Sequence, residues 1–150
     1  MVSRLTLAYD GSQFAGWAVQ PGERTVAGEL GRALAVVLRQ PVGLVVAGRT
    51  DRGVHALGQV VSYDGPLPSL RSVNALLPDA IAVLAAEEAP DGFNARHDAR
   101  SRSYVYRVLA RAAPSPFETG RALWWPYPVD RAALDACAAA HARRASRSTG

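Results

Sequence analysis

Two short apolar runs enclose a polar, glycine-rich segment, and this arrangement constrains the fold more than any other feature. The runs cover residues 42–47 and 59–63, and each has the length and the valine content of a β-strand. Residues 49–57 are therefore predicted to form a loop held between two buried strands, which is a rigid mount for functional groups. The first run is apolar on both faces, which predicts a strand at the centre of a sheet covered by helices.

The predicted loop holds four side chains suited to chemistry or binding: Arg49, Asp51, Arg52 and His55. Glycines on both sides and within the loop permit tight turns or close approach to a ligand. One alternative is structural, with the Asp51 carboxylate capping nearby amides and Arg49 as its surface ion-pair partner. We interpret His55 as a hydrogen-bonded loop residue rather than as an acid or base.

The N-terminal part of the chain alternates between strand and helix patterns. Residues 4–9 have the period of a half-buried strand and are followed by a turn at 10–12. Thr25 is the predicted N-cap of a helix that stops at Pro41, with Glu29 and Arg32 on its solvated face. Ser69 caps a second, shorter helix, with Leu70, Val73, Leu76 and Leu77 facing inward. Residues 81–86 form a further strand. Phe14 and Trp17 stand in a loop, where such aromatics are more often core residues than binding platforms.

The C-terminal part mixes arginine with aromatic residues. Residues 103–109 alternate as a strand would, with Tyr104 and Tyr106 on one face, and Arg96, Arg100 and Arg102 precede them. Cations for phosphate and rings for stacking are what a single-stranded nucleic acid site uses. The alternative is an amphipathic strand with two core tyrosines.

The bulky run at 123–127 is expected to close the core. Asp130 is expected to cap a last helix over 131–141, which is followed by a disordered basic tail at 142–150.

Composition supports a single basic domain. The chain has 150 residues, all 17 of its basic residues are arginine, and its net charge is +4. An RNA partner suits such a chain, although a GC-rich genome would also favour arginine. Cys137 is the only cysteine, which excludes an intrachain disulfide and a cysteine-based zinc cluster and indicates a reducing compartment. Without a signal-peptide pattern or an apolar run of ~20 residues, a cytoplasmic location away from the membrane is expected.

Three segments together resemble the motifs of one family. They are Tyr-Asp-Gly-x-x-Phe-x-Gly-Trp-x-x-Gln at 9–20, Gly-Arg-Thr-Asp-x-Gly-Val-His-Ala at 48–56 with Gly-Gln-Val-Val behind it, and Phe-x-Ala-Arg with Arg-x-Tyr-x-Tyr at 93–106. This set is similar to the tRNA pseudouridine synthase A family over about 140 residues. The resemblance implies an α+β fold, a ferredoxin-like antiparallel sheet with helices on one face, as the first half of a two-lobed pseudouridine synthase.

The family's activity is the isomerisation of uridine to pseudouridine in the anticodon stem-loop of tRNA, at sites 38, 39 and 40, by a homodimer without cofactor or metal. Carried over residue by residue, the resemblance implies that Asp51 is the nucleophile and that Tyr104 contacts the target uridine. Arg49 would hold the flipped-out strand, and we expect Arg52, Arg96 and Arg102 to contribute to substrate binding.

Residues 1–141 would then be the lobe with the catalytic aspartate, and the C-terminal lobe, which supplies the aspartate's basic partner, would be absent. The loss of apolar pattern at Ala142 suggests a truncated or frame-shifted chain. Two alternatives stay open. One is a truncated, catalytically inactive RNA-binding module. The other is a metal-dependent hydrolase that uses Asp51, His55 and His97, although their spacing matches no metal motif.

Overall fold

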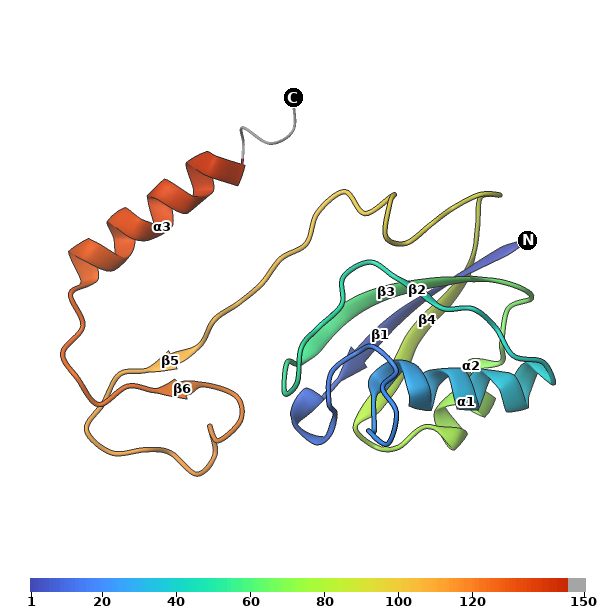
Figure 1. The fold of residues 1–150 in the computed structure, drawn as a ribbon, viewed down its shortest axis with the longest axis horizontal. Coiled ribbons are helices and arrows are strands. Elements are labelled where there is room, and N and C mark those ends of the chain that lie inside the picture. The colour runs from blue at the N-terminus through green and yellow to red at the C-terminus, as the bar shows by residue number, and fades with distance from the viewer. Residues whose placement is uncertain (146–150) are drawn as a thin grey trace. The chain divides into compact units, whose positions relative to one another are not determined.

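The first of two units in the chain, Met1–Ser103, is built on a four-stranded antiparallel sheet with the order β2-β3-β1-β4 (Figure 1). Its elements are β1 (Val2–Tyr9), the 3-10 turn η1 (Gly11–Gln13), α1 (Val26–Leu38), β2 (Val45–Val46), β3 (Ala56–Asp64), α2 (Leu70–Leu76) and β4 (Ile81–Ala89). This computed structural model describes residues 1–145, with side chains through residue 140. The succession β-α-β-β-α-β, with both helices on one side of the sheet, confirms the predicted ferredoxin-like class.

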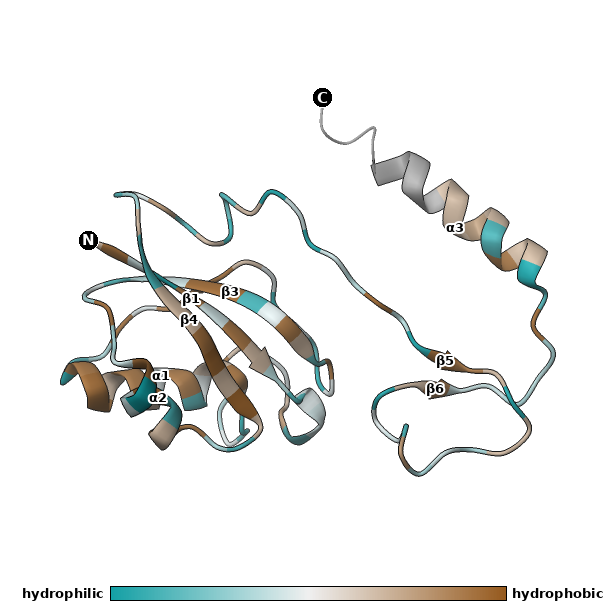
Figure 2. Ribbon diagram, turned by 180° about the vertical axis from the view of Figure 1, so that it is seen from behind, coloured by the Kyte–Doolittle hydropathy of each residue, from teal (hydrophilic) through white to brown (hydrophobic). Residues whose placement is uncertain are grey.

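The core lies between α1 and the sheet. Leu5, Leu7 and Tyr9 alternate along β1 and are buried against the inner face of α1, where Leu30 and Leu34 are also buried. In Figure 2 brown, the hydrophobic colour, marks much of α1 and parts of the strands that lie above it in the view. The predicted helix bounds are confirmed: Thr25 Oγ1 accepts the Gly28 N–H at 3.2 Å, and the helix ends before Pro41.

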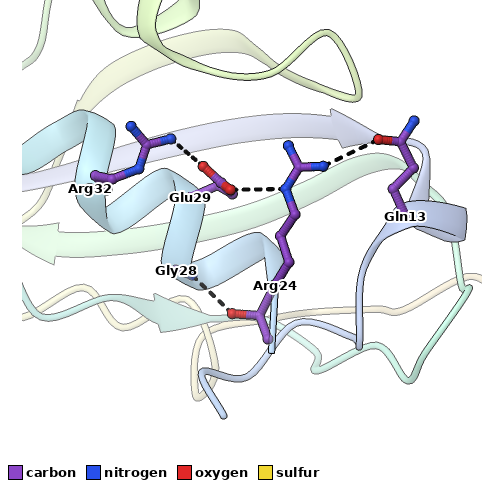
Figure 3. Close-up of polar contacts among 6 residues, drawn as sticks. Gln13, Arg24, Gly28, Glu29 and Arg32 are labelled. Atoms are coloured by element: carbon purple, nitrogen blue, oxygen red, sulfur yellow. Dashed lines mark hydrogen bonds and ion pairs between the residues drawn. The ribbon is translucent and has the colours of Figure 1, made fainter. Parts of the chain in front are cut away.

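Phe14 and Trp17 are core residues, only 2% and 3% exposed, which confirms the structural interpretation of these aromatics. The Arg24 guanidinium covers the Phe14 ring, 5.1 Å from its centre, and also donates to Gln13 and Glu29. Figure 3 shows the Glu29 carboxylate of α1 between Arg24 and Arg32. Arg32 is exposed as predicted, but the Glu29 side chain is only 16% exposed, because the two arginines cover it. Hydrogen bonds from Arg32 and then Arg24 lower the pKa of Glu29 below its ordinary value.

Two predictions about this unit are wrong in detail. The run at 42–47 is not a central strand, because only Val45–Val46 pair and their single neighbour is β3, at the edge of the sheet. Pro41 and Gly43 interrupt the extended run, and its remaining apolar side chains line a cavity beside α1 instead. In α2, Val73 and Leu77 are buried as predicted, but Leu70 and Leu76 are largely exposed, since a two-turn helix presents only one face to the sheet.

The second unit, Tyr104–Gly150, contains a parallel pair of short strands and a helix. These are β5 (Val108–Leu109), β6 (Leu123–Trp124) and α3 (Arg131–Ala145). The predicted strand over 103–109 is therefore wrong for all but its last two residues. Nor does the aromatic run close a core: Trp124 is 44% exposed and Trp125 packs edge-on against Tyr127. Two strands of two residues form too small a surface to bury such rings.

The predicted cap of the last helix is confirmed, because Asp130 Oδ1 accepts the Ala133 N–H at 3.0 Å. The helix runs to Ala145, past the predicted end near His141. The remainder of the predicted basic tail, residues 146–150, lies outside the described residues. Across residues 1–145, none of the helices has the length and apolar character that crossing a membrane requires.

Candidate active site

A loop joins β2 and β3, as the flanking apolar runs predicted, and it lies against the end of β1. The Thr50 carbonyl accepts the Trp17 N–H at 2.9 Å, and the Thr50 hydroxyl lies 2.8 Å from the hydroxyl of Tyr9. From β3, Gln59 Nε2 donates a hydrogen bond to the Gly48 carbonyl at 2.7 Å. The start of the loop is therefore fixed by the segment that follows β1 and by β3.

Asp51 stands at the tip of this loop with its side chain exposed to solvent. Its backbone carbonyl accepts the Val54 N–H at 3.2 Å, closing a tight turn in which Gly53 has φ +79°. Among residues 1–140, whose side chains the structure describes, no hydrogen bond or ion pair reaches the Asp51 carboxylate, so the alternative of a capping aspartate paired with Arg49 is not what the structure contains. Both carboxylate oxygens are available to a substrate.

His55 is a hydrogen-bonded loop residue, as predicted. Its Nδ1 accepts the Gly11 N–H at 3.1 Å and lies 3.1 Å from Oδ1 of Asp10. The Asp10 carboxylate in turn accepts the amide and the hydroxyl of Ser12, which fixes the η1 turn. His55 thus joins the end of the loop to the turn after β1.

Two glycines allow the segment after β1 to touch the loop. A Cβ atom at Gly11 would stand 2.0 Å from the Val54 carbonyl oxygen, which no real side chain could occupy. Gly16 has φ +112°, and a Cβ there would meet the Thr50 carbonyl oxygen at 2.9 Å. The segments that carry the motifs at 9–20 and 48–56 therefore pack directly against each other, and Asp51 lies at the surface of this contact.

The four predicted arginines have different surroundings. Arg52 forms an ion pair with Glu23 at 3.0 Å, and Arg102 donates from Nε to the Ala47 carbonyl at 2.7 Å and from Nη2 to the Arg96 carbonyl at 2.9 Å. The exposed guanidinium groups of Arg49 and Arg96 have no partner among the described residues. Arg102 therefore holds backbone, whereas Arg49 and Arg96 can bind a ligand.

Arg49 and Arg96 line one cavity of about 710 Å³ beside α1 and β2, together with Trp17 and Arg32. Asp51 is not among its lining residues, so this cavity is not the site of the carboxylate. Tyr104 begins the second unit of the chain and is 65% exposed there.

Sequence reasoning missed the residues that support the site. Tyr9 and Gln59 read as members of alternating strands, yet both hold the loop, and Gln59 Nε2 also lies 3.3 Å from the Tyr9 hydroxyl. The buried Ser62 hydroxyl accepts the Ala95 N–H at 3.0 Å and so fixes the backbone next to Arg96. A polar residue inside an apolar strand was the available signal for Gln59 and Ser62.

The metal-hydrolase alternative gains no support from the part of the chain that the structure describes, where no three histidine, cysteine, aspartate or glutamate residues form a group that could hold a metal ion. His97 is exposed, and its backbone N–H donates to Asn94 Oδ1 at 3.1 Å.

Comparison with known proteins finds curated relatives that belong to one class, the tRNA-modifying enzymes. Specifically, the chain is 49% identical over 142 residues to "tRNA pseudouridine synthase A" of Frankia casuarinae, which covers 90% of this chain and 52% of that relative. Proteins of the same name match at 45% identity over 140 residues in Burkholderia multivorans, with 90% and 52% covered, and at 44% over 133 residues in Lacticaseibacillus casei, with 85% and 54% covered. No family model matches the sequence.

These relatives confirm the predicted resemblance to the tRNA pseudouridine synthase A family. The chain spans about half the length of the curated relatives it matches.

Proposed function

We propose that this chain converts uridine to pseudouridine in tRNA, at sites 38, 39 and 40 of the anticodon stem-loop, with Asp51 as the nucleophile. The observation that carries the proposal is the exposed Asp51 carboxylate at the tip of a loop that Tyr9 and the segment after β1 hold in place. The names of the relatives support tRNA as the substrate. By the same resemblance, the complete protein is a cytoplasmic homodimer.

For the isomerisation, the main chemical group that the protein must supply is a correctly positioned carboxylate. Asp51 adds to ribose C1′ or to the pyrimidine ring, and the bond from C1′ to base N1 breaks. The base turns, C5 bonds to C1′ and the bond to Asp51 breaks, so the carboxylate is released. The proton on C5 leaves to a base or to water, and N1 takes up a proton. No electrons are exchanged with another molecule, so the reaction needs no redox cofactor.

The arginines and Tyr104 would bind the extruded nucleotide and its strand. Taking a base out of its stack costs a few kcal/mol, which new contacts must offset. Arg49 and Arg96 have guanidinium groups available for phosphate. Arg52 would exchange Glu23 for phosphate, Arg102 would order the backbone before the tyrosines, and Tyr104 would stack on the flipped base.

A second candidate is an RNA-binding module without turnover. Two observations favour it: the chain spans about half the length of its relatives, and in the described part of the chain no basic side chain pairs with Asp51. An unpaired carboxylate lacks a group that would orient it for attack. Binding and turnover must therefore be measured separately.

The deciding experiment is tritium release from tRNA that carries 5-tritiated uridine, because bond formation at C5 expels that tritium. The variants are Asp51→Asn and, as a matched control, Asp64→Asn, which alters another exposed aspartate at the far end of β3. We expect release by the wild type and by Asp64→Asn and none by Asp51→Asn. If a folded wild-type chain binds tRNA and releases no tritium, the isomerase proposal fails and the binding module stands.

A further inference from the structure

The contact between His55 and Gly11 has no part in the chemistry proposed for Asp51. We propose that His55 is a positioning residue: its Nδ1, acting as a hydrogen-bond acceptor, holds the end of the loop against Gly11 and so sets the place of Asp51. This inference rests on the proposed function of Asp51, and it gives the imidazole a task other than proton transfer.

Asp51 is held from its N-terminal side by Thr50. The Thr50 side chain meets Tyr9 at 2.8 Å, and its carbonyl accepts the Trp17 N–H at 2.9 Å. Both partners are nearly fully buried, so this first anchor cannot move without disturbing the core.

The second anchor lies on the C-terminal side, at Val54 and His55. The Val54 carbonyl packs directly on Gly11, and the Val54 N–H donates to the Asp51 carbonyl. The hydrogen bond from the Gly11 N–H to His55 Nδ1 closes this contact across 44 residues of sequence. Movement of His55 away from Gly11 would therefore shift Val54 and, through the turn, Asp51.

The acceptor role requires a particular form of the imidazole. A neutral ring with its proton on Nε2 presents a lone pair at Nδ1 to the Gly11 N–H. A proton on Nδ1 would instead point to Asp10 Oδ1, 3.1 Å away, and would leave the Gly11 N–H without its acceptor. Asparagine at position 55 can offer Oδ1 in place of Nδ1, whereas leucine offers no acceptor.

The test compares His55→Leu with His55→Asn in the tritium-release assay. The matched control is Asn74→Leu, which removes a similar contact at β4, the edge strand opposite β2, where Asn74 Oδ1 accepts the Val83 N–H at 2.8 Å. We expect His55→Leu to lower kcat by about tenfold to a hundredfold, the usual effect of a misplaced catalytic group, with KM for tRNA changed less than about twofold. His55→Asn should restore most of kcat, and Asn74→Leu should lower the Tm without changing kcat. Unchanged kcat in His55→Leu, or an asparagine variant as slow as the leucine variant, would overturn the assignment.

Amide hydrogen exchange of Gly11 and Val54, followed by NMR, separates this inference from the proposed function. We expect both amides to exchange faster in His55→Leu than in the wild type and His55→Asn. A wild-type chain that releases no tritium defeats the isomerase proposal alone, because the exchange data still report whether His55 holds the loop. Wild-type exchange rates in His55→Leu would defeat the positioning role whatever the turnover.

Discussion

The hydroxyl oxygens of Tyr9 and Thr50 lie 2.8 Å apart, so the last residue of β1 is joined to the residue that precedes Asp51. Tyr9 is buried and its ring lies 6.2 Å from that of Trp17, centre to centre. The central strand, an aromatic pair and the aspartate loop therefore form one rigid piece, and the predictions below follow from its contacts.

Replacing Tyr9 with phenylalanine should lower both stability and turnover. The change leaves the Thr50 hydroxyl and the Gln59 amide without one partner, which costs about 1 kcal/mol of unfolding free energy. Urea denaturation and tritium release measure the two effects. Tyr63→Phe is the matched control, since it removes a bond of 2.8 Å to the Pro66 carbonyl far from the loop. Equal turnover in the two variants would show that the Tyr9 hydroxyl does not serve the loop.

Alanine at position 11 should destabilise the chain by steric conflict. The new Cβ would stand 2.0 Å from the Val54 carbonyl oxygen, and because that atom is backbone, the loop or the turn must move. We expect a loss of about 1–3 kcal/mol, the range for overpacked sites, read as a lower Tm. Gly43→Ala is the control, because nothing lies within 4 Å of its Cβ position. A Gly11→Ala chain as stable as the Gly43→Ala chain would contradict the described contact.

Removing Arg49 or Arg96 should weaken tRNA binding in a salt-dependent way. Each guanidinium that contacts a phosphate releases about one counterion, so each alanine variant should reduce the slope of log K against log salt by about 1. The measurement is tRNA affinity at several salt concentrations. Arg71→Ala, on the exposed side of α2, should leave the slope unchanged. Slopes identical to the wild type in both variants would remove these arginines from the binding surface.

Glu29 should make stability depend on pH in acid. Its pKa in the folded chain is lowered, chiefly by the hydrogen bond from Arg32 and then by that from Arg24. The stabilisation is therefore complete above the ordinary glutamate range and is lost as the pH falls through the lowered native value. Because both arginines are partly exposed, Glu29→Gln should cost no more than about 1 kcal/mol near neutral pH.

Urea titrations of the wild type and Glu29→Gln at a series of pH values check this sign. The difference in unfolding free energy should shrink toward zero in acid. A difference that grows as the pH falls would mean that the carboxylate is not stabilised by its two arginines.

The sequence carried clear signals where structure is decided locally. Thr25 and Pro41 fix the limits of α1, and the alternation of Leu5, Leu7 and Tyr9 identifies β1 and its inner face. The sequence pattern gave wrong predictions where the structure depends on which strands pair with each other. The run at 42–47 looks central because it is apolar, but a strand's place in a sheet is set by its partners, and β2 has only β3. Likewise, the alternation at 103–109 could not show that only its last two residues find a partner.

The same distinction holds for the site. Asp51, Arg49 and Arg52 were predicted as site residues because they lie together in one long motif. The pairing of Arg52 with Glu23 joins residues 29 positions apart, and that of Arg102 with the Ala47 carbonyl joins residues 55 apart. Such contacts leave no periodic trace in a sequence, since they depend on the folded positions of both partners.

Because β1 lies between β3 and β4 in the sheet, the sheet can form only after both of these later strands have been synthesised. β1 precedes both of its partners in the chain, β3 and β4, which end at Asp64 and Ala89. In a chain growing on the ribosome, β1 therefore has no partner strand until residues 56–64 have emerged, and its second edge is unpaired until residues 81–89 follow. Pairing β1 with β3 and β4 closes loops of tens of residues, and such non-local contacts slow folding while the apolar side chains of Leu5 and Leu7 stay exposed.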